Sequence, residues 1–130
     1  MKFLLVVSVA FLFASCGENA DVVVGNKTTM EIISVFDAGD VYKGEVITAK
    51  FTIKNTGDYP LVIGEVKGSC SCTVAEKPEE PILPGGESEV VAYVNTDKLQ
   101  AGPILKSVRI ISNTDPSINE VIIKANVMRK

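Results

Sequence analysis

Apolar and polar residues alternate over several short stretches between residues 31 and 128. The clearest stretch is 47–54, where isoleucine, alanine and phenylalanine alternate with threonine and lysine. A period of two places one face of a strand in the core and the other in water. The same period returns in residues 87–95 and 120–128. No helical period extends beyond one turn, so the pattern predicts an all-β chain.

Turn-forming residues separate these stretches. Residues 55–58 (Asn-Thr-Gly-Asp) predict a turn, and residues 84–86 (Pro-Gly-Gly) predict a type II turn, because glycine takes the positive φ of its third position. Gly64 and Gly68 indicate a bulge or a bend. Residues 96–102 read as a single capped helical turn that ends at a glycine.

About seven strands result, with turns every 8–12 residues. This spacing is typical of an antiparallel β-sandwich. A small closed barrel is the alternative architecture. A single domain over residues 31–130 accounts for all the strands.

The N-terminus has the features of an export signal. Lys2 precedes an apolar run, Phe3 to Ala14, that is too short to span a bilayer. Ala14-Ser15-Cys16 resembles the lipobox of bacterial lipoproteins, although Phe13 stands where leucine is usual. We therefore expect a signal peptide over residues 1–15, lipid (palmitate among its acyl chains) on Cys16, and a tether over residues 16–30. An ordinary secretory signal with an incidental cysteine is the alternative.

Charge and composition exclude several functions. The chain carries 13 basic and 16 acidic residues, a net charge of −3, and no histidine. A mildly acidic chain has no electrostatic footprint for nucleic acid. The absence of histidine removes Ser-His-Asp and Cys-His nucleophile systems and His-bearing metal sites. We expect no enzymatic activity and no cofactor.

A series of short motifs resembles a known family. The motifs occur in a characteristic order, with Ser69-Cys70-Ser71-Cys72-Thr73 in the middle: Phe36-Asp37-Ala38-Gly39-Asp40-Val41, Gly44, residues 51–57, Leu61-Val62-Ile63, Pro84-Gly85-Gly86 and Asn113-Thr114. Together they resemble a bacterial domain-of-unknown-function family whose fold is similar to Hydin-like and major-sperm-protein-like immunoglobulin domains. The resemblance implies an immunoglobulin-like sandwich and a place in the cell envelope. The family commonly has glycine between the cysteines, where this chain has Ser71.

Cys70 and Cys72 are the candidates for chemistry. In a flat strand their Cα atoms would lie about 6.7 Å apart, at the limit of the roughly 4.4–6.8 Å that a disulfide needs. A bend at Gly68 would bring them closer. Three alternatives remain open: two packed thiols, a structural or redox-labile disulfide, and a Cu(I) clip. A zinc site would need four ligands, more than this pair supplies.

The sequence thus favours a lipid-anchored protein of the bacterial envelope, with the outer membrane the favoured location. Its domain would bind an unidentified protein or support an assembly, through a strand edge or a sheet face. Ile122, on the nominally solvent face of the last strand, is the candidate interface residue. The alternative function is thiol redox chemistry or Cu(I) handling at Cys70 and Cys72.

Overall fold

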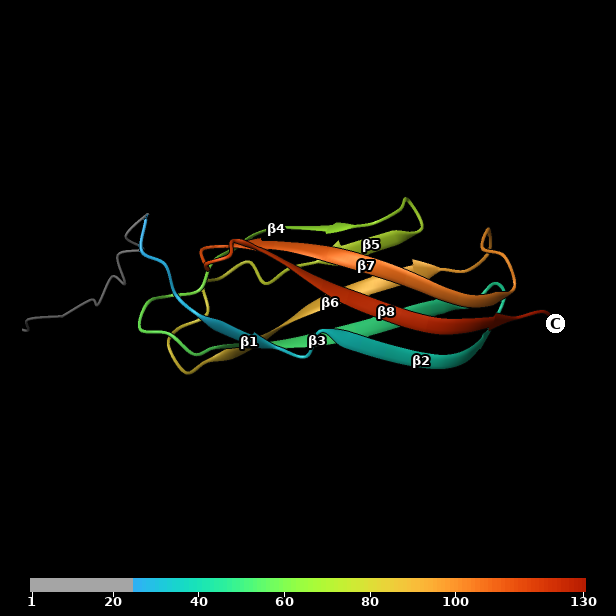
Figure 1. The fold of residues 1–130 in the computed structure, drawn as a ribbon, viewed down its shortest axis with the longest axis horizontal. Coiled ribbons are helices and arrows are strands. Elements are labelled where there is room, and N and C mark those ends of the chain that lie inside the picture. Colours follow the sequence, from blue (N-terminus) through green and yellow to red (C-terminus); the bar gives the residue numbers. More distant parts are fainter. Residues whose placement is uncertain (1–24) are drawn as a thin grey trace, which may run out of the picture.

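Two four-stranded sheets pack face to face in a computed structural model that describes residues 25–130 (Figure 1). The sheet orders are β1-β3-β6-β5 and β2-β8-β7-β4. The strands are β1 (Met30–Ile32), β2 (Val35–Tyr42), β3 (Val46–Asn55), β4 (Ile63–Gly68), β5 (Thr73–Glu76), β6 (Glu87–Asn95), β7 (Gly102–Ser112) and β8 (Ile118–Met128). The predicted all-β, immunoglobulin-like sandwich is confirmed.

The core lies between the sheets and is made by the alternating positions of the long strands. Along β3, every second residue from Ile47 to Asn55 is buried and the others are exposed. Phe51 of β3 meets Phe36 of β2 edge to face, with ring centroids 6.3 Å apart, a favoured aromatic geometry. Burial of apolar area at about 25 cal/mol per Å² is the main stabilising term. The buried apolar residues of the main strands are Ile47, Ala49, Phe51, Ile53, Val90, Ala92, Val94, Val108, Ile110, Val121, Ile123, Ala125 and Val127.

The N-terminal part of the domain passes from one sheet to the other. β1 pairs antiparallel with β3, and after Ile33 and Ser34 the chain continues as β2 in the second sheet. There β2 runs parallel to β8, with Val35 opposite Ile122. The remaining strand pairs within residues 25–130 are antiparallel. The sequence pattern did not predict this parallel pair, because alternation within a strand is independent of its neighbour's direction.

The connecting loops gather at the two ends of the sandwich (Figure 1). The described chain enters at one end, where the Thr28 N–H donates to the Asn113 carbonyl at 3.0 Å. The β2–β3 turn and the C-terminus lie at the opposite end (Figure 1). The β4–β5 loop lies toward that second end, where the Asn95 N–H, at the end of β6, donates to the Cys72 carbonyl at 2.9 Å.

The helical turn predicted over residues 96–102 is wrong. This segment is a tight turn, closed by the Leu99 N–H on the Thr96 carbonyl at 3.1 Å, and β7 begins at Gly102. The Thr96 side chain does not cap a helix. Its hydroxyl donates to the Glu45 carbonyl at 2.6 Å and accepts from the Gly44 N–H at 2.9 Å. Thr96 therefore ties the β6–β7 connection to the β2–β3 turn.

Candidate functional site

The two cysteines lie in a loop that crosses from one sheet to the other. β4 is the edge strand of one sheet and β5 is the edge strand of the other. Residues 69–72, which we call the disulfide loop, join them. The Ser69 N–H donates to the Ser107 carbonyl of β7 at 2.8 Å, and the Cys72 carbonyl accepts from Asn95 of β6. The loop is therefore hydrogen-bonded to both sheets.

Glycines shape the strand that leads into the loop. The register of β4 against β7 shifts between Ile63 and Glu65, so the bulge predicted near Gly64 is present. At Gly68 the chain passes close to β5: a Cβ there would lie 2.5 Å from the Thr73 carbonyl oxygen. The crossing from β4 to β5 therefore requires a residue without a side chain at this position.

A disulfide joins Cys70 and Cys72, whose Cα atoms are 5.2 Å apart. The pair does not lie in a flat strand. The Thr73 N–H donates to the Cys70 carbonyl at 3.1 Å, which closes a turn over the two cysteines. This turn shortens the Cα separation into the range that a disulfide needs. In this form the two sulfurs are bonded to each other and are not free thiolates for Cu(I).

The surroundings of the two sulfurs differ. Both residues are half-buried, and Cys72 packs against the hydrophobic core. The hydroxyl of Thr73, a buried residue, lies 3.6 Å from each Sγ atom. The disulfide thus has one side toward the core and a hydroxyl beside both sulfurs.

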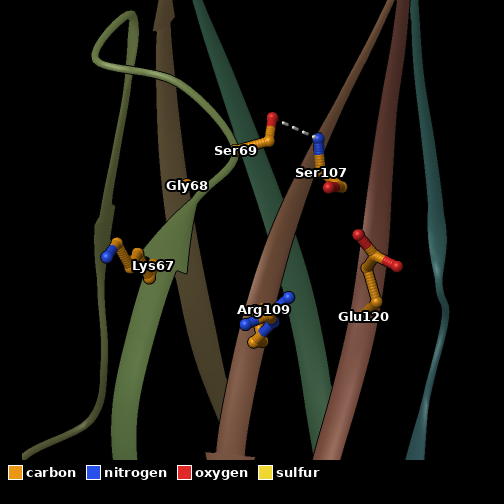
Figure 2. Close-up of a pocket in the computed structure, with 6 residues that line it drawn as sticks. All are labelled: Lys67, Gly68, Ser69, Ser107, Arg109 and Glu120. Carbon is orange, nitrogen blue, oxygen red and sulfur yellow. Dashed lines mark hydrogen bonds between the residues drawn. The ribbon is translucent and has the colours of Figure 1, made fainter.

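A shallow polar hollow of about 310 Å³ lies beside the disulfide loop and is lined by Ser69, the residue before Cys70. Figure 2 shows Arg109 of β7 and Glu120 of β8 side by side, while Lys67 extends away from them. Ser69 closes one end of the hollow, where its Oγ accepts from the Ser107 N–H at 3.1 Å (Figure 2). The hollow carries two cationic side chains and one carboxylate.

The outer face of the β2-β8-β7-β4 sheet carries the predicted interface residue. Ile122 is half-buried on β8 and lies opposite Val35 of β2. On β7, Leu105 is two residues from Ser107, the partner of Ile122, and 67% of its surface is exposed. Farther along, Ile118 lies opposite Ile111. We call these five apolar residues the outer apolar row: Val35, Leu105, Ile111, Ile118 and Ile122.

Two asparagines, one in the turn over residues 55–58 and the other in the Asn113-Thr114 motif, organise the end of the sandwich where the chain enters. The Asn55 side chain is fully buried and makes four hydrogen bonds. Asn113 holds two chain segments through its amide, which donates to the carbonyls of Asn26 and Pro60 at 3.0 and 2.9 Å. Each asparagine is followed by threonine in the sequence, and this repeated Asn-Thr pair was the sequence feature that could have pointed to their role.

The predicted lipid attachment point, Cys16, lies outside the described residues, as do the signal peptide over residues 1–15 and most of the tether. Within residues 25–130, no helix is long and apolar enough to cross a membrane. The same residues contain no group of three or more His, Cys, Asp or Glu side chains placed to hold a metal ion.

A family model described as "Protein of unknown function (DUF1573)" matches residues 29–127. No curated protein matches the chain. Among solved structures, a protein of unknown function from Porphyromonas gingivalis W83 is similar, with a TM-score of 0.68 and 27% identity over 77% of this chain. The match covers 47% of that protein, so this chain spans about half its length.

Two further structures share the fold at low identity. The ASH/PapD-like domain 7 of human CEP192 has a TM-score of 0.62 and 9% identity, and the match covers 95% of this chain and 98% of that one. The periplasmic chaperone SfaE has a TM-score of 0.52 and 10% identity, with 78% and 57% covered. These two likenesses concern the fold alone.

Proposed function

Since the chain belongs to the DUF1573 family of unknown function, we propose its function from its own surface: a non-enzymatic module that binds another protein. The outer apolar row carries the proposal. Val35, Leu105 and Ile118 are 45%, 67% and 52% exposed on one face of one sheet. Single exposed apolar residues are ordinary, but a row of them on one face is typical of an interaction surface.

The charges along the same face define the chemistry of the partner. Asp37 and Lys124 lie opposite each other across β2 and β8, and Arg109 and Glu120 lie opposite each other across β7 and β8. The Asp37–Lys124 pair lies beside Leu105, and the Arg109–Glu120 pair lies between Ile122 and Ile118, so charges of both signs lie within the apolar row. The partner is a protein surface that carries apolar side chains and charges of both signs. Pairing of opposite charges across the interface fixes the register and orientation of the two proteins.

Photo-cross-linking in intact cells tests this interface. A photoreactive residue at Leu105 of the full-length chain is expected to yield an adduct with one partner protein. Thr52, exposed on β3 of the other sheet, is the matched control and is expected to yield none. Equal adducts from both positions, or none from Leu105, would exclude the outer apolar row as the interface.

We further propose that the module is held on the bacterial envelope by lipid on Cys16. Small residues before the cysteine and the short apolar run support this. Acyl chains contribute about 0.8 kcal/mol for each buried CH₂, and two or more chains hold far better than one. Cys16→Ala is expected to move the protein out of the membrane fraction, and mass spectrometry of the mature N-terminus reports the lipid directly. An unmodified Cys16 would overturn the anchor.

A second function, thiol–disulfide exchange at Cys70 and Cys72, is favoured by the size of the ring that the disulfide closes. In the chain-entropy model a loop of three residues gains only about 1.6 kcal/mol, against about 3 kcal/mol for a loop of 15 residues. Stabilisation is thus a weak reason for this disulfide. Rapid reduction of the native protein by glutathione, followed by thiol titration, tests this function, and a pair that resists glutathione would exclude it.

A further inference from the structure

Thr73 places a buried hydroxyl against both sulfurs of the disulfide. The residue is 6% exposed, and its Oγ1 lies 3.6 Å from the Sγ atoms of Cys70 and Cys72. Since a disulfide sulfur carries no hydrogen, the hydroxyl is the donor, and its single hydrogen is shared between the two sulfurs. Within residues 25–130, these two sulfurs are the hydrogen-bond partners of the Thr73 hydroxyl.

The strength of this hydrogen bond depends on the redox state of the pair. A disulfide sulfur is a weak acceptor, whereas a thiolate is charged, and hydrogen bonds to charged groups are about twice as strong as neutral ones. The hydroxyl therefore gains more from the reduced pair than from the oxidised pair. A site that stabilises its reduced form is a stronger oxidant.

We propose that Thr73 is a positioning residue that makes Cys70–Cys72 an oxidant of thiols by donating to the Cys72 thiolate as it forms. This inference rests on the second proposed function. Cys72 packs against the core, and Cys70 is not among the residues packed there, so an incoming thiolate reaches Cys70 Sγ. A new bond forms to that sulfur, the Cys70–Cys72 bond breaks, and the electron pair goes to Cys72 Sγ beside the Thr73 hydroxyl.

The second half of the exchange completes the electron balance. A second thiolate of the partner attacks the partner sulfur in the mixed disulfide. That bond breaks, its electron pair goes to Cys70 Sγ, and Cys70 takes a proton from water, while the Cys72 thiolate accepts from the Thr73 hydroxyl. Two electrons thus pass from the partner to the pair, and the partner leaves as a disulfide. The substrate class is a thiol pair, supplied by one dithiol or by two molecules of a monothiol.

The test is the thiol–disulfide equilibrium of the full-length chain in glutathione redox buffers, near the ordinary thiol pKa of about 8.5, where thiolate is populated. Thr73→Val is expected to shift this equilibrium about tenfold toward the disulfide, equivalent to about 30 mV for a two-electron couple. Thr73→Ser keeps the hydroxyl and is expected to restore the wild-type value. Reduction by dithiothreitol in a parallel arm shows whether a dithiol is preferred to a monothiol.

Thr48→Val is the matched control: Thr48 lies on β3, two strands away from β5, and its exposed side chain is on the face of the sheet opposite to the buried Thr73. If Thr73→Val does not fold, Thr73→Ala removes the same hydroxyl without adding a methyl group. A wild-type pair that glutathione cannot reduce would overturn the second function itself. A reducible pair whose equilibrium is the same in Thr73→Val would overturn only the role of Thr73.

Discussion

At the scale of single residues, Asn55 does more than its place in a turn indicated. Its Oδ1 accepts from the Thr28 hydroxyl and the Gly57 N–H at 2.9 and 3.0 Å. Its Nδ2 donates to the carbonyls of Tyr59 and Ile82 at 2.7 and 2.8 Å. The side chain thereby fills all four of its hydrogen-bonding positions and joins four separate points of this end of the sandwich.

Asn55→Ala is expected to lower the free energy of unfolding by about 3 kcal/mol, because it leaves several buried polar groups without partners. Urea denaturation of the domain measures the loss. Asn126→Ala is the control: Asn126 is exposed, and its amide donates to the Asp40 carboxylate at 2.7 Å. This control is expected to change stability by less than about 0.5 kcal/mol. Equal losses in both variants would contradict the role of Asn55.

Local turn chemistry was the most predictable part of the chain. The type II turn predicted at residues 84–86 is present, with Gly85 at φ +79° and the Gly86 N–H on the Leu83 carbonyl at 2.8 Å. Glycine at a positive φ is a local requirement, so sequence alone reveals it. Thr96 and Thr73 were not predictable in this way, because their hydroxyls bind the β2–β3 turn and the disulfide through the tertiary fold.

At the scale of elements, the long alternating stretches are strands, as predicted. The short strands were harder to predict from the sequence. β5 has four residues and lies at a sheet edge, so it carries too little alternation to be recognised. The sequence indicated a strand with a bend at Gly68 for the cysteines, and it did not indicate the turn that holds them. The turn depends on how β4 and β5 approach each other between two sheets, which no local pattern encodes.

Gly68→Ala is expected to separate β4 from β5, because its Cβ would lie 2.5 Å from the Thr73 carbonyl oxygen and 2.7 Å from the Thr73 Cβ. Overpacking of this kind costs about 1–3 kcal/mol, measurable by urea denaturation. Hydrogen exchange at the Thr73 N–H should rise as well. Gly64→Ala is the control within the same strand, where the nearest atom to a new Cβ is 3.6 Å away. A variant at Gly68 as stable as that at Gly64 would contradict the close approach.

At the scale of the whole molecule, we expect the disulfide to contribute little to the stability of the sandwich. Replacing both Cys70 and Cys72 with alanine is expected to lower the free energy of unfolding by no more than about 1.6 kcal/mol, the entropy contribution of a three-residue loop. Thermal and urea unfolding of the oxidised wild type and the double variant measure the difference. A loss above about 3 kcal/mol would assign the disulfide a structural role instead.

The parallel pairing of β2 with β8 has a mechanical consequence. The described chain enters at one end of the sandwich and leaves at the other (Figure 1). Within the second sheet, β2 comes first in the chain and β8 last, and these two neighbouring strands run in the same direction. A force that pulls the two termini apart acts along these strands and loads their hydrogen bonds together, in shear. A domain tethered at its N-terminus and pulled through its C-terminal strand would resist tension rather than unzip one bond at a time.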